Sequence, residues 1–180
     1  MCQRAQNQFL KYSRIKTLSL ADLYGGKICA ALARQHPRDL FDVKILLENS
    51  GLTDRVRQAF IGYLISSPRP MHELLNPMSN LKDFQKTFED GFIGMTDISI
   101  SHEELNDVLH ILIKQLHEKL TSEERQFLLS VKSGEPDWSL FPISGIDKLP
   151  SIQWKIINIQ KMTNEKRNLA FEKLKNVLAM

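Results

Sequence analysis

Residues 19–51 read SLADLYGGKICAALARQHPRDLFDVKILLENSG, and this stretch predicts two consecutive helices. Ser19 has an acidic residue three positions later, the spacing of a capping box, which satisfies free backbone donors at a helix start. Pro37 suits a first helical position, because its missing N–H group has no partner to lose there. We therefore predict one helix over residues 20–35 and a second over residues 37–48.

Helix signals continue along the rest of the chain. Further capping boxes begin at Ser101 and Thr121, and each precedes a stripe of apolar residues. Residues 133–150 contain three prolines and predict an ordered loop. A weak alternation over residues 12–18 predicts one edge strand. We expect a mainly α-helical fold, with residues 1–18 as a strand and linker and residues 19–180 as one helical domain.

The composition excludes several classes of protein. With 42% hydrophobic and 25% charged residues, the chain has the balance of a globular protein rather than a disordered one. The net charge of +3 is too small to indicate nucleic-acid binding without a local basic patch. No stretch approaches the roughly 20 apolar residues of a membrane span. The two cysteines have no disulfide or metal-ligand spacing, so we expect a cytoplasmic protein that contacts no membrane.

No metal site is predicted from the histidines. His110 and His117 lie two helical turns apart, about 10.5 Å of rise, which is too far for one shared ion. Trp138 and Trp154 are expected to pack the long loop onto the helical body, with base stacking as the alternative. The basic residues from Lys155 onwards are expected to form a solvated helix face, with an RNA-facing surface as the alternative.

Charged residues interrupt the apolar faces of the first two predicted helices. Lys27 and Arg34 lie seven residues apart on one line of the first helix, and Asp39 interrupts the apolar line of the second. Arg38 and Asp42 form an i,i+4 pair beside it. A buried charge without a partner costs several kcal/mol, so each needs an ion pair or an open cleft. The short connection predicts that Lys27 or Arg34 meets Asp39 or Asp42.

Two interpretations of these charges remain open. In the first, they form a structural ion-pair cluster that sets the angle between the two helices. In the second, Lys27 and Arg34 face an anion such as a phosphate group. Asp39 and Asp42 would then orient the cations, help to hold a metal, or assist proton transfer.

The order of these charges is also typical of a known family. The run D-L-x-x-x-K followed by R-x-x-x-R-D-x-x-D spans residues 22–42. Further matching segments are FEDGFIGMTD at 88–97, ERQFLLS at 124–130, EPDW at 135–138 and LPSIQWKIIN at 149–158. Together they resemble the AbiEii/AbiGii toxin family, the nucleotidyltransferase-like partners in type IV toxin–antitoxin systems.

The resemblance implies the C-terminal lobe of a polymerase-β-like nucleotidyltransferase. It implies Mg²⁺-dependent transfer from a nucleoside triphosphate, GTP or a pyrimidine triphosphate, to an RNA such as tRNA, and a cognate antitoxin as partner. By position, it assigns Lys27 to the triphosphate. Either Asp39 or Asp42 would be the distal catalytic acid or a brace for Lys27, and Arg34 and Arg38 would contact phosphate or brace the site.

One family motif is absent from the sequence. The family's Gly-Ser turn and Asp-x-Asp strand do not occur, although two-metal nucleotidyl transfer needs such a carboxylate pair. We therefore expect a truncated chain, inactive alone, that binds neither Mg²⁺ nor nucleotide productively. The alternative is a non-enzymatic module that binds the antitoxin, RNA or its own copy. A homodimer would form through the unpaired edge of strand 12–18 or through exposed apolar helix faces. A plain structural protein is the third hypothesis.

Overall fold

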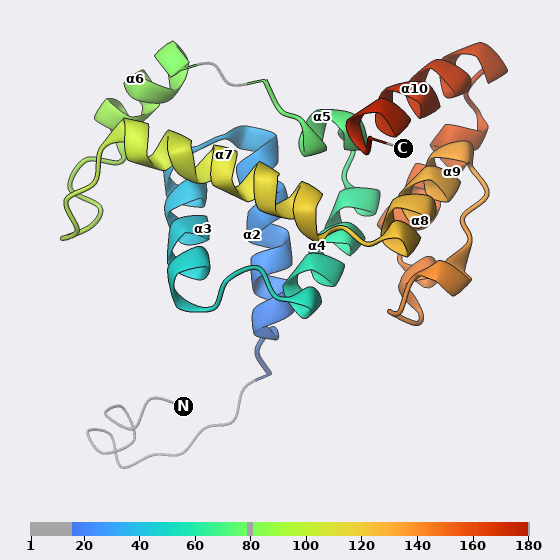
Figure 1. Cartoon of the computed structure of the whole chain (residues 1–180), viewed down its shortest axis with the longest axis horizontal. Helices are drawn as coiled ribbons and strands as arrows, with labels where there is room; N and C mark the ends of the chain where they lie inside the picture. The colour runs from blue at the N-terminus through green and yellow to red at the C-terminus, as the bar shows by residue number, and fades with distance from the viewer. Residues whose placement is uncertain (1–15, 79–80, 180) are drawn as a thin grey trace.

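The computed structural model describes residues 16–78 and 81–179, and all regular structure in these ranges is helical (Figure 1). The elements are α2 (Leu20–Arg34), α3 (Pro37–Asn49), α4 (Asp54–Ser66), α5 (Met71–Leu75), α6 (Leu81–Gly91), α7 (His102–Lys119), α8 (Ser122–Ser133), the 3₁₀ turns η1 (Trp138–Leu140) and η2 (Ile146–Lys148), α9 (Pro150–Gln160) and α10 (Asn164–Val177). The prediction of a mainly α-helical fold is confirmed. The predicted strand lies largely outside the described residues, and residues 16–18 within them have no regular structure.

The predicted caps set the starts of the helices. The capping boxes at Ser101 and Thr121 are both complete. At the start of α2, the Ser19 hydroxyl accepts the N–H of Asp22 at 3.1 Å. The second half of that predicted box is replaced, because the Asp22 carboxylate accepts a hydrogen bond from the Tyr63 hydroxyl at 2.9 Å. This bond ties the first turn of α2 to α4.

A close helix crossing fixes the position of α2. A Cβ atom added at Gly25 would lie 2.8 Å from the Ala59 Cβ atom and 2.8 Å from the backbone nitrogen of Phe60, so only glycine permits this approach. Ile28 and Phe60 are fully buried at this contact between α2 and α4. The crossing therefore decides which face of α2 is left for its charged residues.

The remaining helices form one continuous core with the first three. Helix α7 runs across α2 and α3 in Figure 1 and packs on α3, while α6 packs on α7. Helices α8 and α9 pack together, and α10 packs on α8 and α5. With the exception of Ile159, the buried apolar side chains form a single cluster that extends from Ile28 in α2 to Leu178 after α10. None of the described helices is long and apolar enough to span a membrane.

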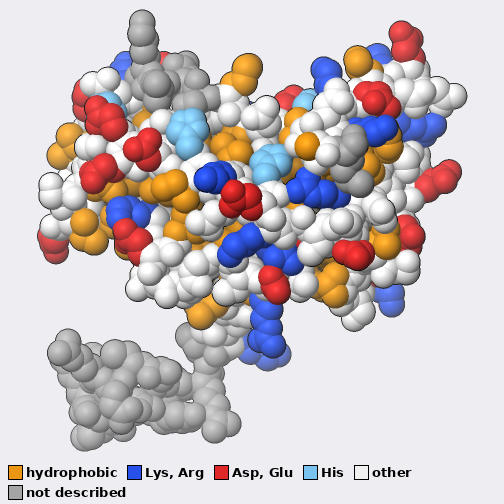
Figure 2. Space-filling view, in the orientation of Figure 1, with side chains coloured by type: hydrophobic (Ala, Val, Ile, Leu, Met, Phe, Trp, Pro, Cys, Tyr) orange, Lys and Arg blue, Asp and Glu red, His pale blue; other side chains and the backbone are white. Residues whose placement is uncertain are grey.

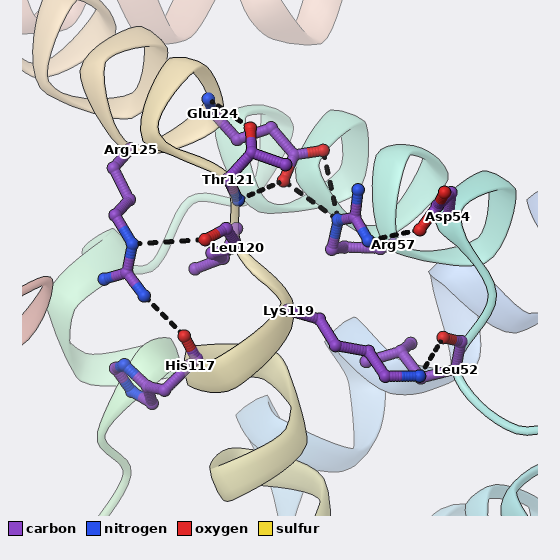
Figure 3. A network of polar contacts seen from close by, with 9 residues as sticks. All are labelled: Leu52, Asp54, Arg57, His117, Lys119, Leu120, Thr121, Glu124 and Arg125. Carbon is purple, nitrogen blue, oxygen red and sulfur yellow. Dashed lines mark hydrogen bonds and ion pairs between the residues drawn. The ribbon is translucent and has the colours of Figure 1, made fainter.

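A buried ion pair joins α4 to the start of α8 (Figure 3). Nε of Arg57 donates to the two carboxylate oxygens of Glu124 at 3.1 and 2.9 Å, and its Nη1 donates to Asp54 at 2.6 Å. The same glutamate accepts the backbone N–H of Thr121 at 3.0 Å, which closes the capping box. Arg57 and Glu124 are only 5% and 3% exposed. One carboxylate therefore both caps α8 and neutralises a buried arginine.

Of the two tryptophans that were expected to pack the loop before α9 onto the helical body, only Trp138 does so. Phe127 on α8 stacks on Phe141 with ring centroids 4.6 Å apart, and Trp138 lies 5.5 Å from the same ring. Trp138 therefore packs the loop onto the helical body as predicted. The expectation for Trp154 is wrong, because its side chain is 59% exposed. The expectation of a solvated face is also wrong for Lys155, which is buried on the side of α9 that faces α4.

Candidate functional site

Two ion pairs cross the interface between α2 and α3. The Lys27 ammonium group donates to the Asp42 carboxylate. Two turns further along α2, Nη2 of Arg34 donates to Oδ1 of Asp39 at 2.9 Å. These four residues are called the seam below. The sequence predicted that these two cations meet these two acids, and the structure confirms it. Lys27 pairs with Asp42, and Arg34 pairs with Asp39.

The seam is accessible to solvent. The side chains of Lys27 and Asp42 are 33% and 40% exposed, and Arg34 is 65% exposed. The sequence predicted that Lys27 lies on the face of α2 that points to the core. This prediction is wrong for the first half of α2, because Leu23 on the same face is 39% exposed. The reason is that α4 packs on the face of α2 that contains Gly25. Lys27 is therefore neither enclosed nor free, but half-buried and paired.

A pocket of about 320 Å³ opens at one end of the seam. It is lined by Arg34, His36, Arg38 and Asp39. Asp42 is paired with Lys27 rather than with Arg38, which was its predicted i,i+4 partner. Within the ranges that the structure describes, Arg38 makes no ion pair. Two guanidinium groups and one carboxylate therefore border the pocket, so its formal charge is positive.

His36 adds a neutral donor to this pocket. It is the N-cap of α3, and its Nδ1 accepts the backbone N–H of Arg38 at 3.2 Å, so the ring proton belongs on Nε2. Burial lowers the pKa of His36, the positive charges of Arg38 and Arg34 lower it further, and Asp39 opposes them. The ring is therefore uncharged at neutral pH. The N-terminus of a 13-residue helix also favours an anion at this place.

A second pocket of about 540 Å³ shares Arg34 and His36 with the first and extends towards Arg69, Asn76 and Phe84. Gln35 joins the two helices in the left-handed conformation, with a φ of 50°. Its side chain donates to the carbonyl oxygen of Met78 at 2.9 Å. The connection between α2 and α3 is thus fixed to the segment that follows α5, beside both pockets.

The donor set at the seam fits phosphate better than a metal ion. Arginine presents several N–H donors in a planar fork that matches phosphate oxygens. Magnesium needs several oxygen ligands that are free to bind it. The carboxylates of Asp39 and Asp42 are each engaged by a cation, and the described part of the chain has no cluster of three or more His, Cys, Asp or Glu side chains. These residues therefore do not form a Mg²⁺ site.

The fold and the site together define a helical protein with a pocket bordered by two arginines at the start of α3. Residues 2–156 match the family described as nucleotidyl transferase AbiEii toxin, type IV TA system, and the chain belongs to that family. The resemblance noted in the sequence is thereby confirmed. The family implies an antitoxin partner and, in general terms, a nucleoside triphosphate substrate with a divalent metal. No curated protein and no solved structure matches the chain.

Sequence reasoning missed part of the pocket wall. His36 lies directly before Pro37, and this N-cap position beside two arginines was a usable signal. Arg69 had no comparable signal, because it reaches the site through tertiary packing, where it donates to the carbonyl oxygen of Ala33. Figure 2 shows basic and acidic side chains interspersed over the face that it draws.

Proposed function

We propose that the seam and its pocket bind the triphosphate of a nucleoside triphosphate in Mg²⁺-dependent nucleotidyl transfer to an RNA such as tRNA. The observation that carries this proposal is the 320 Å³ pocket at the start of α3, where Arg34 and Arg38 meet an uncharged His36. Two guanidinium forks and an Nε2 proton point to an acceptor with several oxygen atoms. Membership of the nucleotidyltransferase family supports a triphosphate as that acceptor.

The proposal gives a role to each seam residue and to Arg38, which lines the pocket beside the seam. Arg34 and Arg38 contact phosphate oxygens, and Lys27 supplies a point charge for the triphosphate while Asp42 fixes its position. Asp39 holds the Arg34 guanidinium at 2.9 Å and is the candidate for the distal catalytic acid, with Asp42 as the second candidate. The two ion pairs hold Lys27 and Arg34 in place before substrate arrives, which reduces the entropy lost on binding.

Calorimetric titration with inorganic triphosphate, GTP and CTP tests the binding step. Loss of one charge-assisted contact costs about 1.5–3 kcal/mol, so Arg34→Met and Arg38→Met should each weaken binding by about 10- to 150-fold. Arg55→Met is the matched control, because Arg55 is an exposed arginine on α4 outside the seam. Equal affinities for all four proteins would refute the proposed role of the seam.

We propose further that these 180 residues do not transfer nucleotides by themselves. The sequence has no Gly-Ser turn and no Asp-x-Asp pair, which would hold Mg²⁺ in line with the α-phosphate. Incubation with labelled nucleoside triphosphate, Mg²⁺ and tRNA should leave the RNA unlabelled. Label in the tRNA that disappears in an Asp39→Asn variant would contradict this and would assign the activity to the seam.

A second candidate function is a non-enzymatic interaction module that binds the antitoxin. A groove of about 590 Å³ between the start of α2, α4 and residues 143–151 supports it. Tyr63, Ile143 and Leu149 line this groove and are 36%, 39% and 48% exposed. Exposed apolar grooves of this kind favour protein partners. Leu149→Asp should abolish co-purification with the antitoxin, whereas Ile111→Asp on α7 should not. A homodimer that Leu149→Asp dissociates would instead assign the groove to self-association.

A further inference from the structure

The 540 Å³ pocket beside the seam, called the side pocket below, has charges of both signs on its walls. It shares Arg34 and His36 with the 320 Å³ pocket. Its other walls come from the loop before α5, from the end of α5 and from α6, near the place where α2 ends (Figure 1). Arg34 and Arg69 supply its positive charges, and Glu73 and Asp83 supply its negative charges. Because His36 is uncharged at neutral pH, these lining residues have no net formal charge.

Arg69 is an exposed side chain that hydrogen bonds hold at three points. Its Nη1 donates to the carbonyl oxygen of Ala33 in the last turn of α2. Its backbone N–H donates to the Ser67 hydroxyl at 3.2 Å, and its own carbonyl oxygen accepts from Nζ of Lys155 at 2.8 Å. Within residues 16–78 and 81–179, Arg69 makes no ion pair. Its guanidinium group is therefore positioned in advance and keeps donors for a ligand.

Glu73 supplies an open acceptor to the same pocket. Its side chain is exposed, and in the described part of the chain it makes neither a hydrogen bond nor an ion pair, although Arg34 and Arg69 line the same pocket. The segment after α5 is fixed, because Gln35 donates to the carbonyl oxygen of Met78 at 2.9 Å. A carboxylate with open positions accepts O–H and N–H donors. The side pocket thus offers both donors and acceptors to one ligand.

The charges of the two pockets favour different ligands. The two arginines and one aspartate of the 320 Å³ pocket leave a net positive charge, which favours a triphosphate. The neutral side pocket favours a ligand with one phosphate group and several hydroxyl donors. If the nucleoside of the same triphosphate filled it, Arg69 would have no phosphate to bind. A nucleotide within an RNA strand supplies one phosphodiester group for Arg69 and ribose hydroxyl groups for Glu73.

We propose that the side pocket binds the 3′-terminal nucleotide of a single-stranded RNA, with Arg69 on its phosphodiester group and Glu73 on its two ribose hydroxyl groups. The volume is that of a site for one small ligand, so the pocket holds one nucleotide and not a duplex. This inference rests on the proposed function, because the shared Arg34 and His36 bring the RNA end next to the bound triphosphate.

Fluorescence anisotropy with a 5′-labelled single-stranded RNA of eight nucleotides tests the role of Arg69. Arg69→Met should weaken RNA binding by about 10- to 150-fold, the loss expected for one charge-assisted contact. Arg55→Met removes an exposed arginine outside both pockets and should bind the RNA as the wild type does. Equal RNA affinities of the wild type and these two variants, or no RNA binding by the wild type, would overturn the inference.

The same RNA with a 2′,3′-dideoxy end tests the role of Glu73. The wild type should bind it about tenfold or more weakly than the RNA with both hydroxyl groups, and Glu73→Ala should bind the two RNAs equally. Equal binding of the two RNAs by the wild type would also overturn the inference. This comparison needs no substitution, so it decides the question even if a variant does not fold.

Titration with inorganic triphosphate separates this inference from the proposed function. Arg69→Met should bind inorganic triphosphate as the wild type does, because Arg69 does not line the 320 Å³ pocket. If the wild type binds no triphosphate, the proposed function fails, and with it the basis for an acceptor site. If triphosphate binds but RNA binding does not depend on Arg69, only the present inference fails. Weaker binding of GTP by Arg69→Met, with unchanged RNA binding, would assign the side pocket to the nucleoside of the triphosphate instead.

Discussion

Replacing Glu124 with alanine should be among the most destabilising single substitutions in this protein. The carboxylate is 3% exposed and accepts two hydrogen bonds from Arg57 as well as the backbone N–H of Thr121. Without it, Arg57 is left as a buried cation whose remaining acidic partner, Asp54, is 79% exposed. Breaking a buried pair by removing one member costs about 3–5 kcal/mol.

The chain provides its own control for this substitution. Glu104 occupies the same position in the capping box of α7, where it accepts the backbone N–H of Ser101 at 2.7 Å, but its side chain is exposed. Glu104→Ala should therefore cost only about 0.5–1.5 kcal/mol, the contribution of one hydrogen bond. The difference between the two variants isolates the ion pair with Arg57.

Thermal and urea unfolding measure both variants. For a domain of this size, about 3–5 kcal/mol corresponds to a fall in Tm of about 6–20 °C. The double variant Arg57→Met/Glu124→Met should recover much of the loss, because no unpaired charge is then buried. Equal losses for Glu124→Ala and Glu104→Ala would refute the reasoning, since the buried pair would then contribute nothing beyond the cap.

Three further predictions concern packing, the seam and pH. Gly25→Ala should lower the free energy of unfolding by about 1–3 kcal/mol through overpacking against α4, whereas Gly91→Ala, which meets open space, should not destabilise; urea unfolding compares them. Asp42→Asn should change stability by less than about 1 kcal/mol, because the pair with Lys27 is partly exposed, and a loss above about 3 kcal/mol would favour the purely structural interpretation. Burial lowers the pKa of Lys155 from 10.5 to about 8, so between pH 8 and pH 10.5 the unfolded chain binds more protons than the folded chain. The free energy of unfolding should therefore rise by at most about 3 kcal/mol from pH 8 to pH 10.5, and this rise should be absent in Lys155→Met.

Local signals in the sequence predicted the helices well. The three capping boxes and Pro37 mark helix starts that the structure contains, because caps act within one turn of the chain. The same signals could not show that Glu124 also neutralises Arg57, which lies 67 residues away. A bond across such a separation depends on how α8 packs against α4, and no local pattern encodes it.

The part of the candidate site that depends on local spacing was predicted, and the part that depends on tertiary packing was not. The seam residues lie on two adjacent helices with a short connection, so their meeting followed from spacing alone. The burial of the line through Leu23 was predicted wrongly, because the close approach at Gly25 turns a different face of α2 towards α4. The burial of Lys155 had no sequence signal, since a lysine on a helix is ordinarily solvated.

Nuclear magnetic resonance of the arginine side chains during a titration with inorganic triphosphate gives the most direct test of the phosphate role of the seam. The Nε–H signals of Arg34 and Arg38 should shift together and saturate, while the signal of Arg55 stays in place. Saturable shifts confined to other residues, or no shift of Arg34 and Arg38 at any triphosphate concentration, would contradict the account.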